Sequence, residues 1–214
     1  MARNQSVKGN FNYNNIEKKD KNFMYKNLER SNCYNCNFAG STFDFVSFRG
    51  AHFKSSSFLK CSFKGSEFIG TNFKKSNFKN AIFENTIFDS AKLEDVDFKG
   101  AEFINTVFVS TDLSRTLNLD LNNPGIRVFD EMPKIEISEE LKNTILKCFE
   151  NPYIKSSRIL DTKDGGINTL NIMLLLEQFN EETLIKGLNL LPEKLDREFH
   201  TLSYIMKFIS LLKA

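Results

Sequence analysis

A five-residue period governs residues 31–115 and constrains the fold more than any other feature of the chain. Each of these seventeen consecutive units places a small residue two positions before a bulky apolar one. The bulky positions include an unbroken series of eleven phenylalanines, from Phe38 to Phe88 at steps of five. Self-similarity at a short fixed period is typical of architectures in which each repeat packs on its neighbours. The sequence therefore predicts a solenoid.

The period of five fits neither an amphipathic helix, which repeats about every 3.6 residues, nor the simple alternation of a strand. The chain must then change direction once per unit. If the small and bulky side chains both point inward, the other three positions face solvent, where the lysines and acids of the repeats fall. Glycine recurs at the last position of a unit, as at Gly40 and Gly100, where a tight turn often needs a positive φ.

This pattern resembles that of the pentapeptide-repeat proteins, whose units carry a small residue and a Leu or Phe at the same spacing. The resemblance implies a β-solenoid, a right-handed four-sided β-helix with one unit on each face. Phe23 and Leu28 keep the bulky register ahead of residue 31, but Lys21 and Lys26 stand at small positions, as in a degenerate capping coil. With strands about 4.8 Å apart, we expect about four to five coils and a rod roughly 20 Å long.

The composition changes after Arg115, which predicts a second domain. Alternating leucines at 117–121, a turn at 122–125 and a short strand at 126–129 are expected to cover the open end of the solenoid. From Ser138 the pattern becomes helical, and a small all-α domain is expected. Its later helices are predicted at 167–179, 181–190 and 192–213. The expected domains are an N-terminal cap of degenerate repeats at 1–30, the β-helix at 31–116, a capping turn and linker at 117–137, and the helical domain at 138–214.

Residues with catalytic or metal-binding chemistry are few. The chain has four cysteines and two histidines, with no phosphate-binding loop or metal-ligand pair on a helix. Cys33 and Cys36 form a C-x-x-C, but they occupy a bulky and a small position, so we interpret both as core residues. His52 falls at an outward repeat position, and His200 on the polar face of the predicted last helix. We therefore expect no enzymatic activity and no cofactor.

The chain shows no apolar run in its first thirty residues and no stretch that approaches eighteen apolar residues. Neither a signal peptide nor a membrane span is therefore expected. Few cysteines, none of them evidently paired, favour a cytoplasmic setting.

Charge is distributed unevenly along the repeats, although the net charge of the chain is only +2. Basic residues dominate 49–79 and acids dominate 84–112. Residues twenty apart should stack on one face, which predicts a ladder of Lys54, Lys74 and Glu94 and another of Lys79 and Lys99. The surface is either a solvated mixture or a dipolar rod that steers a partner. The candidate charged residues are Arg49, Lys54, Lys74, Lys79, Glu84, Glu94, Asp95 and Asp97.

Outward apolar residues also gather toward the C-terminal end of the repeats. A contiguous apolar patch usually marks an interface, and the first expectation is that the helical domain folds back on it. The candidate interaction surface consists of Ile69, Ile87, Val107 and Val109 on one side, with Ile82 and Ile104 on the neighbouring side.

The predicted last helix is apolar around most of its girth in its second half. Such a helix should be buried, either within the chain, against a second copy, or in a groove of another partner. The candidate residues of this helix interface are Tyr204, Phe208 and Leu211.

Together these features favour a non-enzymatic scaffold, in which a repeat rod presents a helical domain that recognises a protein partner or a second copy. The alternative comes from the resemblance, because some pentapeptide-repeat proteins mimic DNA, bind type II topoisomerases such as gyrase, and confer quinolone resistance. That activity needs an acidic rod, whereas the middle coils here are basic, which disfavours it. Direct nucleic-acid binding is disfavoured by the small net charge. An enzyme in the helical domain would need a polar pocket that the sequence does not indicate.

Overall fold

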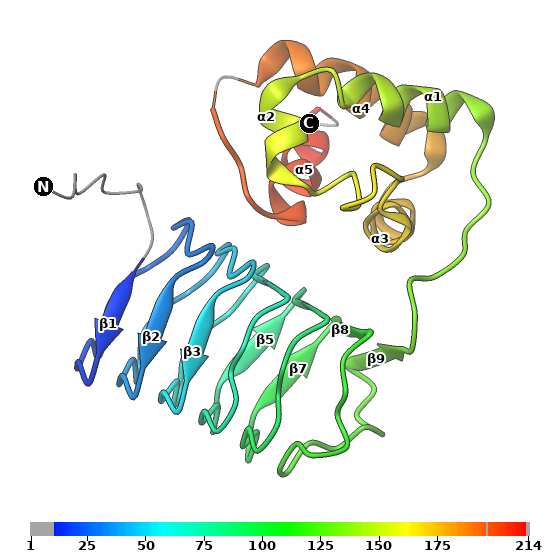
Figure 1. The fold of residues 1–214 in the computed structure, drawn as a ribbon. Helices are drawn as coiled ribbons and strands as arrows, with labels where there is room; N and C mark the ends of the chain where they lie inside the picture. The colour runs from blue at the N-terminus through cyan, green and yellow to red at the C-terminus, as the bar shows by residue number, and fades with distance from the viewer. Residues whose placement is uncertain (1–10, 196, 213–214) are drawn as a thin grey trace, which may run out of the picture. The chain divides into compact units, whose positions relative to one another are not determined.

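The protein divides into two compact units, with the boundary between Asp130 and Glu131. Figure 1 shows the computed structural model, which describes residues 11–195 and 197–212. The first unit is a β-solenoid and the second consists of helices. The predicted fold class, a solenoid followed by a small all-α part, is confirmed.

Parallel strands stacked with a shift of twenty residues build the solenoid. Within the sheets Cys33 pairs with Phe53, and Phe68 pairs with Phe88. A further face is held by single bridges such as Ser57 to Asn77. The strands of the three sheets are β1 (Asn12–Asn14), β2 (Asn32–Tyr34) and β3 (His52–Lys54); β4 (Glu67–Ile69), β6 (Ile87–Asp89), β8 (Thr106–Val109) and β9 (Ile126–Phe129); and β5 (Ile82–Glu84) and β7 (Glu102–Ile104).

The solenoid is longer than the four to five coils expected from the sequence, because it has about six. At the N-terminal side β1 pairs in register with β2, so the degenerate stretch already forms a coil. At the C-terminal side β9 extends the sheet in parallel with β8, and Val128 lies opposite Phe108. The twenty-residue pairing register therefore continues past both limits of the regular pattern.

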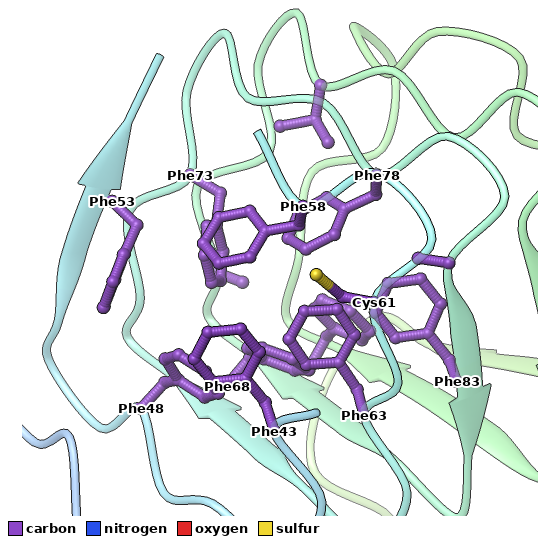
Figure 2. Packing of buried hydrophobic residues seen from close by; sticks show 14 of the residues in the cluster. Phe43, Phe48, Phe53, Phe58, Cys61, Phe63, Phe68, Phe73, Phe78 and Phe83 are labelled. Atoms are coloured by element: carbon purple, nitrogen blue, oxygen red, sulfur yellow. The ribbon is translucent and has the colours of Figure 1, made fainter. Parts of the chain in front are cut away.

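The phenylalanines form continuous stacks through the centre of the solenoid, as Figure 2 shows. The Phe63 ring lies 5.4 Å from Phe43 and 5.1 Å from Phe83, with interplanar angles of 9° and 6°. Within its own coil it meets Phe58 edge to face at 5.8 Å. Both arrangements are favourable for aromatic pairs. Because each coil contributes rings at matching positions, one side-chain type fills the whole cross-section.

The small positions are also explained by the contacts they make. Thr71 Oγ1 donates to the Phe48 carbonyl at 3.0 Å, and Ser76 Oγ donates to the Phe53 carbonyl at 2.6 Å. Ser76 Oγ in turn accepts the backbone N–H of Ser56 at 3.1 Å. A buried hydroxyl must find such partners. Serine and threonine can therefore replace alanine at these inward positions, because the preceding coil supplies the hydrogen bonds.

Corners between the faces use left-handed backbone, as the recurring glycines indicated. Gly100 has a φ of +69°, and a Cβ built there would lie 2.3 Å from Asn80 Oδ1. Asn85 adopts a φ of 53° at an equivalent corner. Glycine and asparagine tolerate this conformation best. A side chain at position 100 would also displace the amide group of Asn80.

Five helices form the described part of the second unit, and two of their N-termini confirm the expected caps. Ser138 Oγ accepts the backbone N–H of Leu141 at 3.1 Å, and Asn180 Oδ1 accepts that of Thr183 at 2.9 Å. The helices are α1 (Glu139–Cys148), α2 (Pro152–Ser157), α3 (Thr169–Gln178), α4 (Glu181–Lys194) and α5 (Leu202–Leu211).

The prediction of one helix over 192–213 is wrong. Pro192 lies inside the last turn of α4, and α5 begins only at Leu202. A proline has no backbone N–H, so the Leu188 carbonyl loses its usual helical donor. The Cys148 thiol donates to that carbonyl at 3.3 Å, and Asn151 Nδ2 donates to the Pro192 carbonyl at 3.2 Å. Side chains of neighbouring segments thus stabilise a proline where the sequence suggested a helix start.

Helix α2 was not anticipated, although its signal is present in the sequence. Asn151 Oδ1 accepts the N–H of Tyr153, and Pro152 occupies the first helical position, where a missing N–H costs nothing. The helix is short and is followed by Arg158 in left-handed conformation. Behind it, the buried Asp161 carboxylate lies 3.3 Å from both Lys155 Nζ and Arg158 Nε.

The stacked rings should dominate the stability of the first unit. Phe63→Ala removes a fully buried ring between two stacked neighbours. We expect it to lower the free energy of unfolding by about 3–5 kcal/mol. Tyr34→Ala, at an exposed aromatic outside the core, should change it by less than about 0.5 kcal/mol. Guanidinium denaturation followed by circular dichroism measures both, and equal midpoints would contradict the dominance of the column.

Candidate interaction surfaces

Residues that flank the phenylalanines point away from the solenoid interior, because side chains alternate along a strand. On the sheet β4–β6–β8–β9, Ile87 pairs with Val107, and Ile69 and Val109 lie on either side of Asp89. We call Ile69, Ile87, Val107 and Val109 the apolar strip. None of the four belongs to the aromatic cluster inside the solenoid. The expectation that they face solvent is nevertheless wrong for three of them, because Ile87, Val107 and Val109 are buried, and Ile69 is half-buried. The sequence placed these residues on one face correctly, and their role as an interface stays a prediction.

The neighbouring sheet carries isoleucines next to acids. Ile82 pairs with Glu102, and Ile104 pairs with Glu84, so that no isoleucine lies directly opposite another. Ile104 is 50% exposed. Each isoleucine is therefore an isolated apolar residue rather than part of a second continuous strip, which is ordinary at a protein surface.

The uneven charge of the repeats is matched between adjacent coils. Lys64 Nζ lies 2.8 Å from Glu84 Oε2, and Lys74 forms an ion pair with Glu94. The basic middle coils thus face the acidic later coils across a single strand spacing. Exposed pairs of this kind contribute only about 0–1 kcal/mol each. Their main consequence is that these lysines and acids neutralise each other locally.

The two predicted charge ladders differ in the ion pairs that their lysines form. Lys74 and Glu94 stack as expected, with the exposed Lys54 one coil earlier. Lys79 contacts Asp97 Oδ2 at 3.0 Å, and the pairing of Asn77 with Asp97 places Lys99 one coil after Lys79. Asp97 directly precedes Phe98, and Lys79 directly follows Phe78 one coil earlier. From these two positions the side chains reach each other.

A further charged residue closes the acidic end of this face. Arg115 forms ion pairs with Glu94 and with Asp95, the latter at 3.1 Å. The hydrogen bond from Lys74 lowers the pKa of Glu94, and the charge of Arg115 acts in the same direction. Arg49 stands at the outward position after Phe48, in the coil that precedes β4. Lys64, Lys74, Lys79 and Arg115 therefore each form an ion pair with an acid of an adjacent coil.

Sequence analysis missed an external aromatic pair at two corners. Tyr25 and Phe45 both have a φ of 60°, a conformation in which bulky residues are rare. Their rings stack at 5.1 Å with an interplanar angle of 9°, and Tyr25 is 60% exposed. The available signal was an aromatic residue at the turn position of two consecutive coils, exactly twenty residues apart in the sequence.

The cysteines and histidines do not converge on a site. All four cysteines are buried, as the repeat positions predicted for Cys33 and Cys36. His52 lies exposed on β3, but His200 precedes α5 and is not on that helix, contrary to the prediction, because the chain leaves the helical path after Lys194. Within residues 11–195 and 197–212, no group of three His, Cys, Asp or Glu side chains is arranged to hold a metal ion.

Helix α5 divides its apolar residues between two sides. Leu202, Ile205 and Ile209 are buried. Of the predicted interface residues, Tyr204 stacks on Phe199 at 4.8 Å and Phe208 is half-buried, whereas Leu211 is 67% exposed. Leu212, directly after the helix, is 40% exposed. The second apolar side of α5 therefore ends in an exposed pair of leucines.

Comparison with known families agrees with this geometry. Two sequence models of pentapeptide repeats match the chain, one over residues 53–96 and the other over residues 27–54 and 88–117. The chain is a pentapeptide-repeat protein. The matched residues carry the central coils of the solenoid, and the helical unit lies outside them.

Solved structures similar to this pentapeptide-repeat protein include Rfr23 from the cyanobacterium Cyanothece 51142, at 15% identity, with 50% of this chain and 88% of that one covered and a TM-score of 0.30. HetL from Nostoc sp. strain PCC 7120, a protein involved in heterocyst differentiation regulation, is 10% identical, with 55% of this chain and 69% of that one covered and a TM-score of 0.22. QnrB1, a plasmid-mediated fluoroquinolone resistance protein, is 13% identical, with 55% of this chain and 93% of that one covered and a TM-score of 0.17. A search of curated proteins found no match.

No helix in the described ranges of this pentapeptide-repeat protein is long and apolar enough to cross a membrane.

The ion pair of Glu94 can be tested by titration. Its pKa lies below the ordinary 4.5, mainly because Lys74 donates to the carboxylate. We expect Lys74→Met to raise that pKa, measured by carboxyl NMR, and Lys54→Met to leave it nearly unchanged. A depressed pKa means that the pair stabilises the fold above the unfolded pKa, and that this contribution disappears as pH falls through the folded pKa. An unchanged pKa in Lys74→Met would refute the pairing.

The thiols should be inert in the folded protein. Burial raises the pKa of Cys33, Cys61 and Cys148 from 9.0 to about 12. At pH 8 these three groups are therefore protonated thiols rather than reactive thiolates. We expect a thiol-specific reagent to modify none of them in native protein within the time that suffices for full modification in guanidinium. Rapid native labelling of any of the three, located by mass spectrometry, would contradict the inward placement.

Proposed function

We propose that this pentapeptide-repeat protein is a non-enzymatic protein-interaction protein. Its solenoid acts as a rigid support, and its helical unit recognises a protein partner or a second copy of the chain. The observation that carries the proposal is the exposed apolar end of α5, formed by Leu211 and Leu212. Large apolar side chains that remain in contact with water gain free energy when a partner covers them.

The rigidity of the support follows from its repeated bonding. Each coil hydrogen-bonds to the next through backbone groups, as in Phe58 N–H to the Asn77 carbonyl at 2.7 Å and Phe63 N–H to the Ile82 carbonyl at 2.9 Å. The interior rings interlock in the same register. A solenoid bonded in this way gains little from changing shape on binding. It is suited to fixing the position of surfaces rather than to closing around a substrate.

Helix α5 has the pattern of a helix that binds in a groove. Tyr204, Phe208 and Leu211 stand at positions i, i+4 and i+7, which share one side of a helix. Ile205 and Ile209 occupy the buried side. An amphipathic helix with anchors at this spacing is a common mode of protein recognition. A partner with an apolar groove, or the same helix of a second copy, would complete the burial.

The DNA-mimicking alternative has less support. A mimic must present acids that are free to meet a DNA-binding surface, but Glu84, Glu94 and Asp97 each pair with a lysine of the preceding coil. The net charge of the whole chain is +2. The likeness to QnrB1 concerns the repeat fold alone. We therefore place the interaction on the helical unit and keep topoisomerase binding as an outcome of the test.

The proposal predicts that one exposed residue controls binding. We expect Leu211→Glu to weaken partner capture or self-association by roughly tenfold or more, because interface anchors typically contribute about 2 kcal/mol. Ser210→Glu adds the same side chain at the neighbouring exposed position and serves as the matched control. The full-length wild type and both variants are used as affinity baits with quantitative mass spectrometry, and light scattering measures their oligomeric state.

Each result decides between the readings. A protein lost from Leu211→Glu but retained by Ser210→Glu supports recognition through α5, and a loss of dimers in the same pattern supports self-recognition. A topoisomerase captured equally by all three baits would favour the DNA-mimicking alternative. Identical captured proteins and identical masses for wild type and Leu211→Glu would overturn the role of α5.

A further inference from the structure

We propose that three lysines at inward positions of the first coil prevent two copies of the solenoid from stacking end to end. Lys18 occupies a bulky position of the repeat, and Lys21 and Lys26 occupy small positions. One coil later, the same positions carry Phe38, Ser41 and Val46, all buried. The proposal concerns self-association at the N-terminal end of the solenoid, and is independent of the role given to α5. The inward positions of the first coil are Phe11, Tyr13, Ile16, Lys18, Lys21, Phe23, Lys26 and Leu28.

The backbone at this end directs N–H groups outward, as the edge strand of a β-sheet does. In each later coil the residue before the central position donates its N–H to the preceding coil, as Asn37 does to the Ile16 carbonyl and Thr42 to the Lys21 carbonyl, both at 2.9 Å. By the same parallel register, the N–H groups of Glu17 and Asn22 point toward the N-terminal end. Edges of this kind pair readily with another chain, and lysines are a common natural means of preventing it.

The side chains at this end would otherwise favour stacking. The Phe23 ring stacks on Phe43 at 4.7 Å with an interplanar angle of 15°, so its opposite side faces the N-terminal end. Phe11 and Tyr13 lie 5.2 Å apart and are only half-buried. The aromatic column thus ends in rings that a second aromatic surface could cover, in the way each coil covers the next.

Charge opposes that contact. Lys21 and Lys26 are exposed, although the equivalent residues of the next coil are buried. Lys18 Nζ lies 5.3 Å from the centre of the Tyr13 ring, which keeps its charge close to the aromatic end. None of the eight inward positions of this coil is an acid. Two such ends brought together would place three lysines against three lysines, while the acids of this coil, Glu17, Asp20 and Glu29, stand at outward positions. Desolvating the ammonium groups in that contact is unfavourable.

The test replaces the charge and keeps the length of the side chains. We expect Lys18→Met, Lys21→Met and Lys26→Met, combined in the full chain, to raise the self-association constant at least tenfold, measured by sedimentation velocity over a concentration series. The combined Lys→Arg variant at the same three positions retains the charge and should match the wild type. A third variant with Lys54, Lys60 and Lys99 changed to Met removes three exposed lysines elsewhere on the solenoid and should also match it.

Hydrogen exchange locates the contact. If the Met variant associates and residues 11–28 gain protection with concentration, the proposal holds. Association with protection elsewhere, or equal association in the Lys54, Lys60 and Lys99 variant, would assign the effect to general loss of charge and overturn it. A folded Met variant with the association constant of the wild type would overturn it as well. If the triple Met variant fails to fold, the Lys21→Met and Lys26→Met double variant gives the same comparison, because both side chains are exposed.

Discussion

Vertical alignment of residues twenty apart is the constraint on which the first unit depends. It places Phe63 between Phe43 and Phe83, Ser76 Oγ below the Phe53 carbonyl, and Lys64 beside Glu84. The aromatic stacks, the satisfied hydroxyls and the ion pairs are therefore consequences of one register. Hydrophobic burial supplies most of the stabilisation, and the polar contacts allow small hydroxyl residues inside and charged residues outside without a large penalty.

The repeat unit could be predicted in detail because it is determined locally. A small residue and a phenylalanine two positions apart specify what faces inward in any coil, whatever its neighbours are. The ends were harder, since Lys21 at an inward position breaks the pattern while Phe23 retains it, and only pairing between β1 and β2 decides that the stretch is a coil. The ion pair between Lys79 and Asp97 was likewise not predicted, because it depends on which side chains of adjacent coils can reach each other.

The helical unit was predictable where local signals dominate and less so where tertiary contacts decide. Ser138 and Asn180 identified their helices through capping chemistry alone. Pro192 suggested a helix start, but the Cys148 thiol and the Asn151 side chain stabilise it within α4. Such contacts join residues about forty positions apart and have no signature in a local pattern. The same holds for α5, whose two apolar sides look alike in sequence and differ in what covers them.

The shared register also restricts how such a chain can change in length. A single inserted residue would exchange inward and outward positions in every unit downstream, so that lysines enter the core and phenylalanines leave it. Five residues inserted between Ile69 and Glu84 would preserve the core but rotate all later coils by one face, which separates Lys64 from Glu84 and Ile69 from the rest of the apolar strip. Only twenty inserted residues leave both the interior and every surface intact. Length variants that keep both the core and the surface of this solenoid should therefore differ by whole coils of twenty residues.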